Sequence, residues 1–163
     1  MRPAAARTCG RRCRSPAALA TTATCTSTSR ATPAIPTCCW RHRLVFAACD
    51  TGFAPIKSLI EHALSLDASP SLSLYWLATR SDGHFLANQC RAWSQALDVF
   101  EYAAFNEADA AAGARQVAAA IRADLFDIEC GFYLAGPEAF VATLGHALAD
   151  AGVPAAQIAT EIV

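Results

Sequence analysis

From residue 43 onward, short apolar runs alternate with longer stretches in which apolar residues recur every three or four positions. The short runs predict strands at 43–49, 71–79, 98–105, 128–135 and 157–163. The periodic stretches predict helices at 54–66, 85–97, 108–125 and 137–151. Strands that alternate with helices of this length form right-handed βαβ units and a parallel sheet. The pattern therefore predicts an α/β fold, namely a doubly wound parallel sheet of about five strands.

The predicted helices each have one apolar face. These faces consist of Ile56, Leu59, Ile60 and Ala63 in the first helix and of Phe140, Val141, Leu144 and Leu148 in the last. Pro55 stands where a helix favours proline, at its first position. Lys57 and Glu61 are four residues apart and are expected to pair on the solvent side of the first helix.

Residues 1–40 follow a different composition. Ala, Thr, Ser, Pro, Arg and Cys dominate this segment, Trp40 is its one aromatic residue, and its apolar positions have no helical or strand period. Such a segment is expected to be irregular or disordered. We therefore divide the chain into an irregular N-terminal extension at 1–40 and an α/β domain at 41–163.

Three interpretations of the extension remain open. A targeting segment would fit its arginines and its lack of acidic residues. A metal site would use Cys9 and Cys13 with Cys38 and Cys39, although their spacing is not the regular spacing of a zinc site. A leader without a structural role, such as a shifted reading frame ahead of a real domain, is the simplest of the three.

Charge and cysteine content restrict the function of the remaining chain. Residues 44–163 hold five basic and 14 acidic residues without a basic stripe, which argues against nucleic-acid binding. Cys49, Cys90 and Cys130 stand singly in apolar segments and are expected to be small buried residues, and we predict no metal site. No apolar run approaches the roughly 20 residues of a membrane-spanning helix. Nothing in this part requires an oxidising compartment, so we expect a cytoplasmic protein without a membrane partner.

Two turns lie where a doubly wound sheet binds its ligands, beyond the carboxyl ends of strands. One turn, residues 50–55, joins the first predicted strand to the first helix, and the other, Gly136-Pro137-Glu138, follows the fourth strand. A helix N-terminus that leaves such a turn presents free N–H groups and the positive end of a dipole. The sequence therefore predicts an anion site, most often for phosphate, at the first turn.

Three motifs in this order resemble the ferredoxin–NADP reductase superfamily. They are DTGFAPIKS at 50–58, LYW at 74–76 with Thr79 and Arg80 after it, and YLAGP at 133–137. The resemblance covers roughly residues 43–163. It is greatest to the nicotinamide-binding domain of flavin-dependent reductase components, such as phenol hydroxylase reductase and the CDP-6-deoxy-glucoseen reductase group. The motif combination is fairly specific, whereas each motif alone is weak.

The resemblance implies a set of coenzyme-binding residues: Thr51, Gly52, Phe53, Ala54, Pro55, Arg80, Gly136, Pro137 and Glu138. Those of the first turn would lie against the pyrophosphate, Arg80 near the adenosine end, and the last three beside the nicotinamide. The implied cofactors are NADH or NADPH, with FAD supplied by a partner or a missing domain. The implied partner is a flavin-domain or electron-acceptor protein. No residue is a credible catalytic acid, base or nucleophile, so the catalytic residues remain unknown.

The chain departs from the family pattern at several positions. Asp50 replaces the first glycine of the turn, where its carboxylate is expected to face the pyrophosphate and to cost on the order of a few kcal/mol. Ala135 replaces the cysteine beside the nicotinamide, and Val163 stands near the place of a terminal aromatic residue. No flavin-binding or ferredoxin motif is present in the sequence.

Two functional hypotheses follow. The first is an oxidoreductase: a nicotinamide-nucleotide-binding domain that places NAD(P)H so that its hydride passes to a flavin. The second is a truncated, non-catalytic remnant or interaction module, in which the first turn keeps its shape and has lost its ligand. In that case Arg80 is an ordinary exposed loop residue. The sequence does not distinguish NADH from NADPH.

Overall fold

A computed structural model of the chain describes residues 43–66, 69–124 and 130–163. The N-terminal extension predicted at 1–40 lies outside the described residues, as do the cysteines proposed there as metal ligands. The same holds for the last residue of the helix predicted at 108–125 and for the first two residues of the strand predicted at 128–135.

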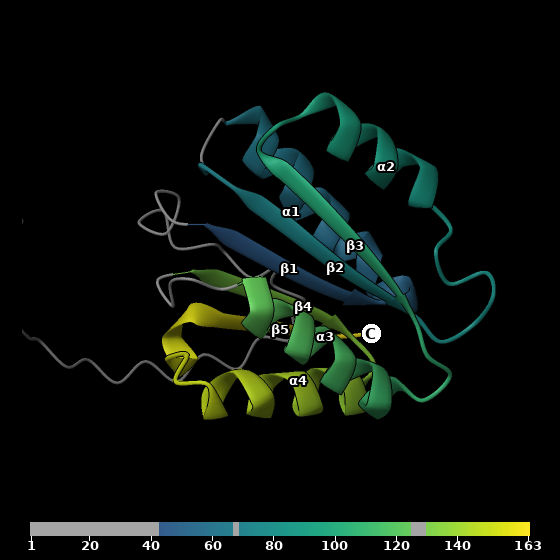
Figure 1. The fold of residues 1–163 in the computed structure, drawn as a ribbon, viewed down its shortest axis with the longest axis vertical. Coiled ribbons are helices and arrows are strands. Elements are labelled where there is room, and N and C mark those ends of the chain that lie inside the picture. The colour runs from purple at the N-terminus through teal and green to yellow at the C-terminus, as the bar shows by residue number, and fades with distance from the viewer. Residues whose placement is uncertain (1–42, 67–68, 125–129) are drawn as a thin grey trace, which may run out of the picture. The chain divides into compact units, whose positions relative to one another are not determined.

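The centre of the fold is one sheet of five parallel strands (Figure 1). The strands are β1 (Leu44–Cys49), β2 (Leu72–Ala78), β3 (Phe100–Asn106), β4 (Gly131–Gly136) and β5 (Ile158–Ile162). Their spatial order is β3-β2-β1-β4-β5, so β1 is central and β3 and β5 form the edges. This arrangement confirms the predicted doubly wound parallel sheet.

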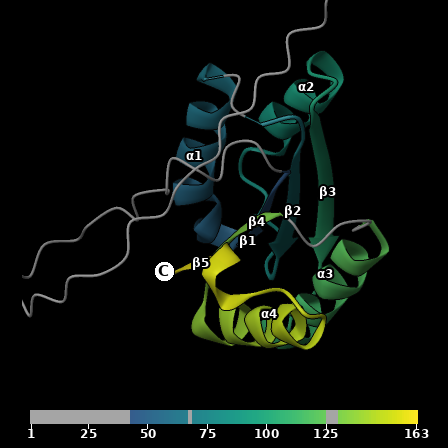
Figure 2. The ribbon, with the colours of Figure 1, turned by 90° about the vertical axis from the view of Figure 1, so that its left-hand side faces the viewer.

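Two pairs of helices cover the sheet, one pair on each face (Figures 1 and 2). The helices are α1 (Phe53–Ser65), α2 (Ala87–Ala96), α3 (Ala110–Asp124) and α4 (Glu138–Asp150). Buried residues of α1 and α2 form one core with the sheet, and those of α3 and α4 form the other. The described residues also form two short 3-10 helices, η1 (Asp50–Gly52) and η2 (Ala155–Gln157).

The central strands are buried along their whole length. Every residue of β1, β2 and β4 is buried, because both faces of a parallel sheet are covered by helices. Successive side chains of β1 enter opposite cores, Phe46 towards α1 and α2 and Ala47 towards α3 and α4. This burial explains why the strands appear in the sequence as continuous apolar runs.

The helix faces also agree with the sequence pattern. Ile56, Ile60 and Ala63 are buried in α1, and Leu59 packs against the same core. Phe140, Val141, Leu144 and Leu148 are buried in α4. The solvent face of α1 carries the expected pair, with Lys57 Nζ donating to Glu61 Oε1 over 2.6 Å.

The start of α1 differs from the prediction. The helix begins at Phe53, so Pro55 is its third residue and not its first. The reason is the turn η1, which runs directly into α1 and extends the helical path towards the strand. Proline is tolerated at this place because the N–H groups of the first helical turn have no intrahelical partner.

The start of α2 differs in the other direction, because the prediction places it at residue 85, too early in the chain. The helix begins at Ala87, and Phe85 lies before it. The Phe85 ring packs edge-on against Trp76, with 5.4 Å between ring centroids, while about half of the side chain stays exposed. This contact holds the connection between β2 and α2 over the end of β2.

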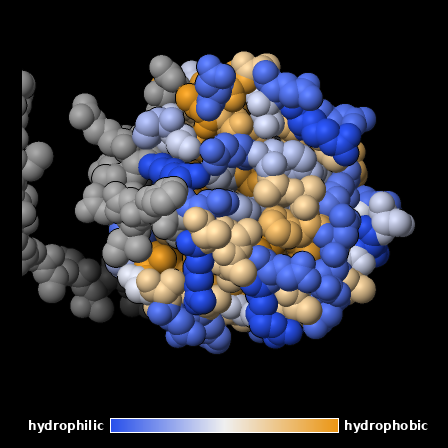
Figure 3. Space-filling view, viewed as in Figure 1, coloured by the Kyte–Doolittle hydropathy of each residue, from blue (hydrophilic) through white to orange (hydrophobic). Residues whose placement is uncertain are grey.

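The strand β3 forms an incompletely covered edge. Glu101, Ala104 and Asn106 are exposed on this strand, which lies in front in Figure 1. Figure 3 shows polar and apolar side chains mixed on this side of the molecule. Within the described ranges, no helix combines the length and the apolar character that crossing a membrane requires.

Candidate functional site

The topological switch point of the sheet lies between β1 and β4. From β1 it proceeds to β2 and β3 on one side, and α3 then returns it to β4 on the other side of β1. The helices that follow β1 and β4 therefore lie on opposite faces, and doubly wound sheets bind their ligands in the crevice at such a switch point. The two sequence segments predicted to bind the coenzyme, 51–55 and 136–138, both lie at this point.

The turn η1 is seated directly on the carboxyl end of β4. A Cβ atom placed on Gly52 would lie 2.2 Å from the carbonyl oxygen of Ala135 and 2.7 Å from the nitrogen of Gly136. Only a residue without a side chain fits between these backbone atoms. The structure therefore brings Gly52 and Gly136, which are far apart in sequence, into close contact.

Two helix N-termini open at the same edge of the sheet. The helix α1 follows β1 through η1, and α4 follows β4 through Pro137. Neither helix has a side-chain hydrogen bond at its N-cap. The N–H of Phe53, the first residue of α1, donates to carbonyl oxygens of η1. In general the first N–H groups of a helical segment have no partner within it, and an anion satisfies both their hydrogen bonds and the dipole. The geometry thus retains the elements of an anion site at the switch point.

The predicted site residues differ in their exposure. Thr51, Ala54, Arg80 and Glu138 are exposed, and Pro55 and Pro137 are half-buried. Phe53 is fully buried, and its ring stacks on Trp76 with 3.9 Å between centroids. Its side chain is therefore part of the core, which leaves only its backbone to contact a ligand.

The Asp50 carboxylate does not project from the turn, contrary to the expectation from the sequence. Its residue is 6% exposed, and both oxygens accept hydrogen bonds from Thr79 at the end of β2. The backbone amide of Thr79 donates to Oδ1 over 2.9 Å, and the Thr79 hydroxyl donates to Oδ2. The carboxylate is therefore directed along the sheet edge towards β2 and away from β4.

Cys49, the last residue of β1, lies beside this carboxylate. Its Sγ is 3.9 Å from Asp50 Oδ2, and the side chain is buried. Burial raises the pKa of the Cys49 thiol to about 12, and the charge and the hydrogen bond of Asp50 act in the same direction. A thiol that is protonated at neutral pH is a poor nucleophile, so Cys49 behaves as a small core residue.

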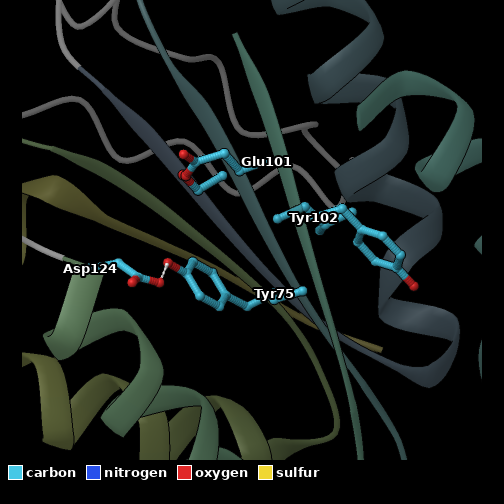
Figure 4. Close-up of a pocket in the computed structure, with 7 residues that line it drawn as sticks. Tyr75, Glu101, Tyr102 and Asp124 are labelled. Atoms are coloured by element: carbon cyan, nitrogen blue, oxygen red, sulfur yellow. Dashed lines mark hydrogen bonds between the residues drawn. The ribbon is translucent and has the colours of Figure 1, made fainter. Parts of the chain in front are cut away.

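A pocket of about 260 Å³ lies away from the switch point, beside the first and middle residues of β2 and β3 (Figure 4). Tyr75 is the middle residue of β2, Glu101 is the second residue of β3, and Asp124 ends α3. Tyr75 donates to Asp124 over 2.8 Å, while Glu101 accepts hydrogen bonds from Arg43 and Ser73. These polar groups bind one another, so the pocket has the character of a structural network and not of a ligand site.

The described residues contain no cluster of side chains that could bind a metal ion. In residues 43–66, 69–124 and 130–163, no three His, Cys, Asp or Glu side chains are placed to hold an ion together. The isolated histidine His84 instead lies with its Nε2 3.0 Å from the carbonyl oxygen of Trp76.

The sequence analysis missed Thr79 and Gly83 as parts of the site. A Cβ atom on Gly83 would lie 2.4 Å from Asp50 Oδ1, so the turn after β2 is packed tightly on the carboxylate. One signal was available in the sequence. Asp50 directly follows the strand predicted at 43–49 and Thr79 ends the strand predicted at 71–79, and adjacent parallel strands end at the same edge of a sheet.

Comparisons with known proteins find similar folds among solved structures at low sequence identity. No known family model matches the sequence, and none of the curated proteins is similar to it. Among solved structures, the CS-b5R domains of human Ncb5or in the NAD+ form match with a TM-score of 0.63 at 14% identity. That match covers 74% of this chain and 37% of the other.

Two ferredoxin-NADP+ reductases are similar to a comparable degree. The enzyme from Plasmodium falciparum matches with a TM-score of 0.60 at 14% identity, over 75% of this chain and 52% of its own. The enzyme from Neisseria gonorrhoeae, with bound FAD and NADP, matches with a TM-score of 0.57 at 16% identity, over 74% and 55% of the two chains. This chain thus spans about half, or less, of the chains it matches. The described residues share the fold of the FAD/NAD-binding domains of ferredoxin–NADP reductase-like proteins, as the motif resemblance predicted.

Proposed function

We propose that residues 43–163 bind NADH or NADPH and serve as the nicotinamide-nucleotide-binding domain of a flavin-dependent reductase. The observation that carries this proposal is the seating of η1 on the end of β4, where Gly52 leaves no room for a side chain. That contact brings two uncapped helix N-termini to one crevice at the switch point. Dinucleotides bind at such crevices in doubly wound folds.

The predicted residues that are exposed or that offer backbone groups receive roles in this proposal. Exposed Thr51 and the backbone of Gly52 and Ala54 would bind the pyrophosphate at the start of α1. Arg80, exposed after β2, would contact the adenosine end. Gly136, Pro137 and Glu138 would border the nicotinamide.

In this proposal the protein contributes binding and orientation, and the cofactor carries the chemistry. When bound, NAD(P)H supplies the hydride, and a flavin on a partner chain or a further domain accepts it. The end of β5 would contact that partner, since Ile162 and Val163 are apolar and are 63% and 52% exposed.

The test is calorimetric titration of the full-length chain with NADH and with NADPH, together with a Thr51→Glu variant. We expect binding at micromolar to submillimolar affinity by the unaltered chain. A carboxylate at the exposed position 51 should weaken it at least tenfold, because a like charge a few ångströms from the pyrophosphate costs more than the roughly 1.4 kcal/mol that a factor of ten requires.

Ser94→Glu is the matched control. It adds the same charge at an exposed position in the second half of α2. That half of the helix lies towards the amino ends of the strands, away from the switch point, so the affinity of this variant for the coenzyme should be unchanged. If the unaltered chain binds neither coenzyme, the proposal is wrong and the non-catalytic remnant or interaction module is supported. If both glutamate variants bind as the unaltered chain does, nucleotide binds at a place other than the crevice.

A further inference from the structure

The most unusual group at the switch point is the buried carboxylate of Asp50. Among the described residues, Asp50 is the one residue other than glycine with a positive φ, at 47°. This backbone conformation favours glycine, and aspartate is one of the few residues that adopt it with little strain. A glycine would therefore be sufficient for the turn itself, so the aspartate side chain needs a separate explanation.

The contacts of Asp50 supply that explanation, because apart from those to its chain neighbours Cys49 and Phe53 they lead to β2 and the turn after it. Both carboxylate oxygens accept from Thr79, one from its amide and one from its hydroxyl. The backbone carbonyl oxygen of Asp50 accepts from Trp76 Nε1 over 3.2 Å. Gly83, at the far end of the turn, packs so closely that a Cβ atom there would lie 2.4 Å from Asp50 Oδ1.

The bridge joins two turns that have separate predicted roles. The turn η1 leads into α1, whose N-terminus forms the anion site, and the turn at 79–83 carries Arg80. The amide of Gly83 donates to the carbonyl oxygen of Arg80 over 3.0 Å, which closes the second turn on itself. Fixing Thr79 and Gly83 against Asp50 therefore also fixes the backbone position of Arg80.

We propose that Asp50 is a positioning residue that ties the 79–83 turn to η1, so that the groups for both ends of a dinucleotide are preorganised on one surface. This inference rests on the proposed function. On this account Asp50 strengthens coenzyme binding, and its replacement by the glycine of the family pattern weakens it. A carboxylate that repelled the pyrophosphate would give the opposite result, tighter binding by the glycine variant.

Two substitutions separate the hydrogen bonds of Asp50 from its charge. Asp50→Asn removes the charge but keeps an acceptor for the Thr79 amide, and its own amide group donates to the Thr79 hydroxyl. Asp50→Gly removes both the charge and the bonds while it relieves the positive φ. We expect NADH affinity within threefold of the unaltered chain for Asp50→Asn and a five- to tenfold loss for Asp50→Gly.

Hydrogen exchange of the Thr79 amide is a readout that needs no coenzyme. Exchange should be at least tenfold faster in Asp50→Gly than in the unaltered full-length chain and nearly unchanged in Asp50→Asn. Asp150→Asn removes an exposed carboxylate at the end of α4 and should alter neither measurement. The amide of Phe46 in the central strand β1 serves as an internal reference, since faster exchange there would reveal global destabilisation.

The outcomes distinguish this inference from the proposed function. If Asp50→Gly binds NADH as tightly as the unaltered chain, or more tightly, the positioning role is wrong although the domain binds nucleotide. If Thr79 exchanges at the same rate in all variants, the bridge itself does not exist in solution. If the unaltered chain binds no coenzyme while Thr79 exchange responds as expected, the proposed function fails, and with it the role in coenzyme binding, but the bridge between the two turns stands.

Discussion

The contact between Gly52 and β4 leads to a quantitative prediction for Gly52→Ala. The backbone of Gly52 has φ −59° and ψ −14°, which alanine adopts without strain. Its Cβ atom, however, would lie 2.2 Å from the carbonyl oxygen of Ala135 and 2.5 Å from the carbonyl carbon. An ordinary contact begins at 3.4 Å, so the turn and the strand must separate by roughly 1 Å.

The cost of that separation follows from the atoms involved. Both neighbours are backbone atoms of β4, which is paired with β1 on one side and β5 on the other, so no side-chain rotation relieves the clash. Overpacking of this kind costs about 1–3 kcal/mol, and the upper part of that range applies to an unyielding backbone. Replacing glycine also lowers the entropy of the unfolded chain, which raises the free energy of unfolding by about 0.4–1 kcal/mol. The net loss should be about 2 kcal/mol.

Denaturant unfolding of the full-length chain, followed by circular dichroism, measures this loss. A loss of about 2 kcal/mol corresponds to a decrease in Tm of roughly 6–10 °C for a domain of this size. Gly145→Ala is the matched control, because Gly145 lies within α4 and a Cβ atom there meets nothing within 4 Å. That variant should gain up to about 1 kcal/mol from helix propensity. If Gly52→Ala is as stable as the unaltered chain while Gly145→Ala is stabilised, then η1 is not seated on β4 and the geometry of the proposed site is wrong.

Two further predictions concern single buried groups. Tyr75→Phe should lower the free energy of unfolding by about 1 kcal/mol, because it removes a hydrogen bond of 2.8 Å to the Asp124 carboxylate. Tyr102→Phe should be neutral or stabilising in the same unfolding assay, because the buried Tyr102 hydroxyl has no partner among the described residues. Above about pH 8 the unfolded Cys49 thiol begins to ionise while the folded thiol, with its pKa raised to about 12, stays protonated. The unfolded state then binds fewer protons, so the free energy of unfolding should fall as pH rises from 8 to 10, with a limiting slope of about 1.4 kcal/mol per pH unit for this group. Denaturation at several pH values should give a shallower fall for Cys49→Ala, and an equal slope in both proteins would contradict the assignment.

The sequence was sufficient for the strand and helix order because burial leaves a strong pattern. A strand such as β1, covered on both faces, is apolar at every position, and α4 has all its buried residues on one face. Element ends were less predictable. The start of α1 was misplaced because Pro55 marked a helix start in the sequence, whereas the 3-10 turn at Asp50–Gly52 continues the helical path backwards.

The site was predictable in place but not in detail. The position of Gly52 and Gly136 at the switch point follows from the strand order. The βαβ pattern predicts the doubly wound sheet in which such a switch point occurs. The direction of the Asp50 carboxylate does not follow from any local pattern. It depends on the pairing of β1 with β2, which brings Thr79 to the same edge, and on the positive φ that turns the side chain towards it.

The position of β1 in the centre of the sheet has a consequence for how the chain folds during synthesis. Leu44 pairs with Leu72 on one side, close in sequence, and with Gly131 on the other, near the end of the chain. The half that contains β1, β2 and β3 can therefore assemble first, because its contacts close short loops. Until β4 emerges from the ribosome, several seconds later at roughly 5–20 residues per second, the second edge of β1 stays unpaired. An apolar strand with an open edge is a template for pairing with other chains, so the aggregation risk of this protein is concentrated in the interval before its last third is made.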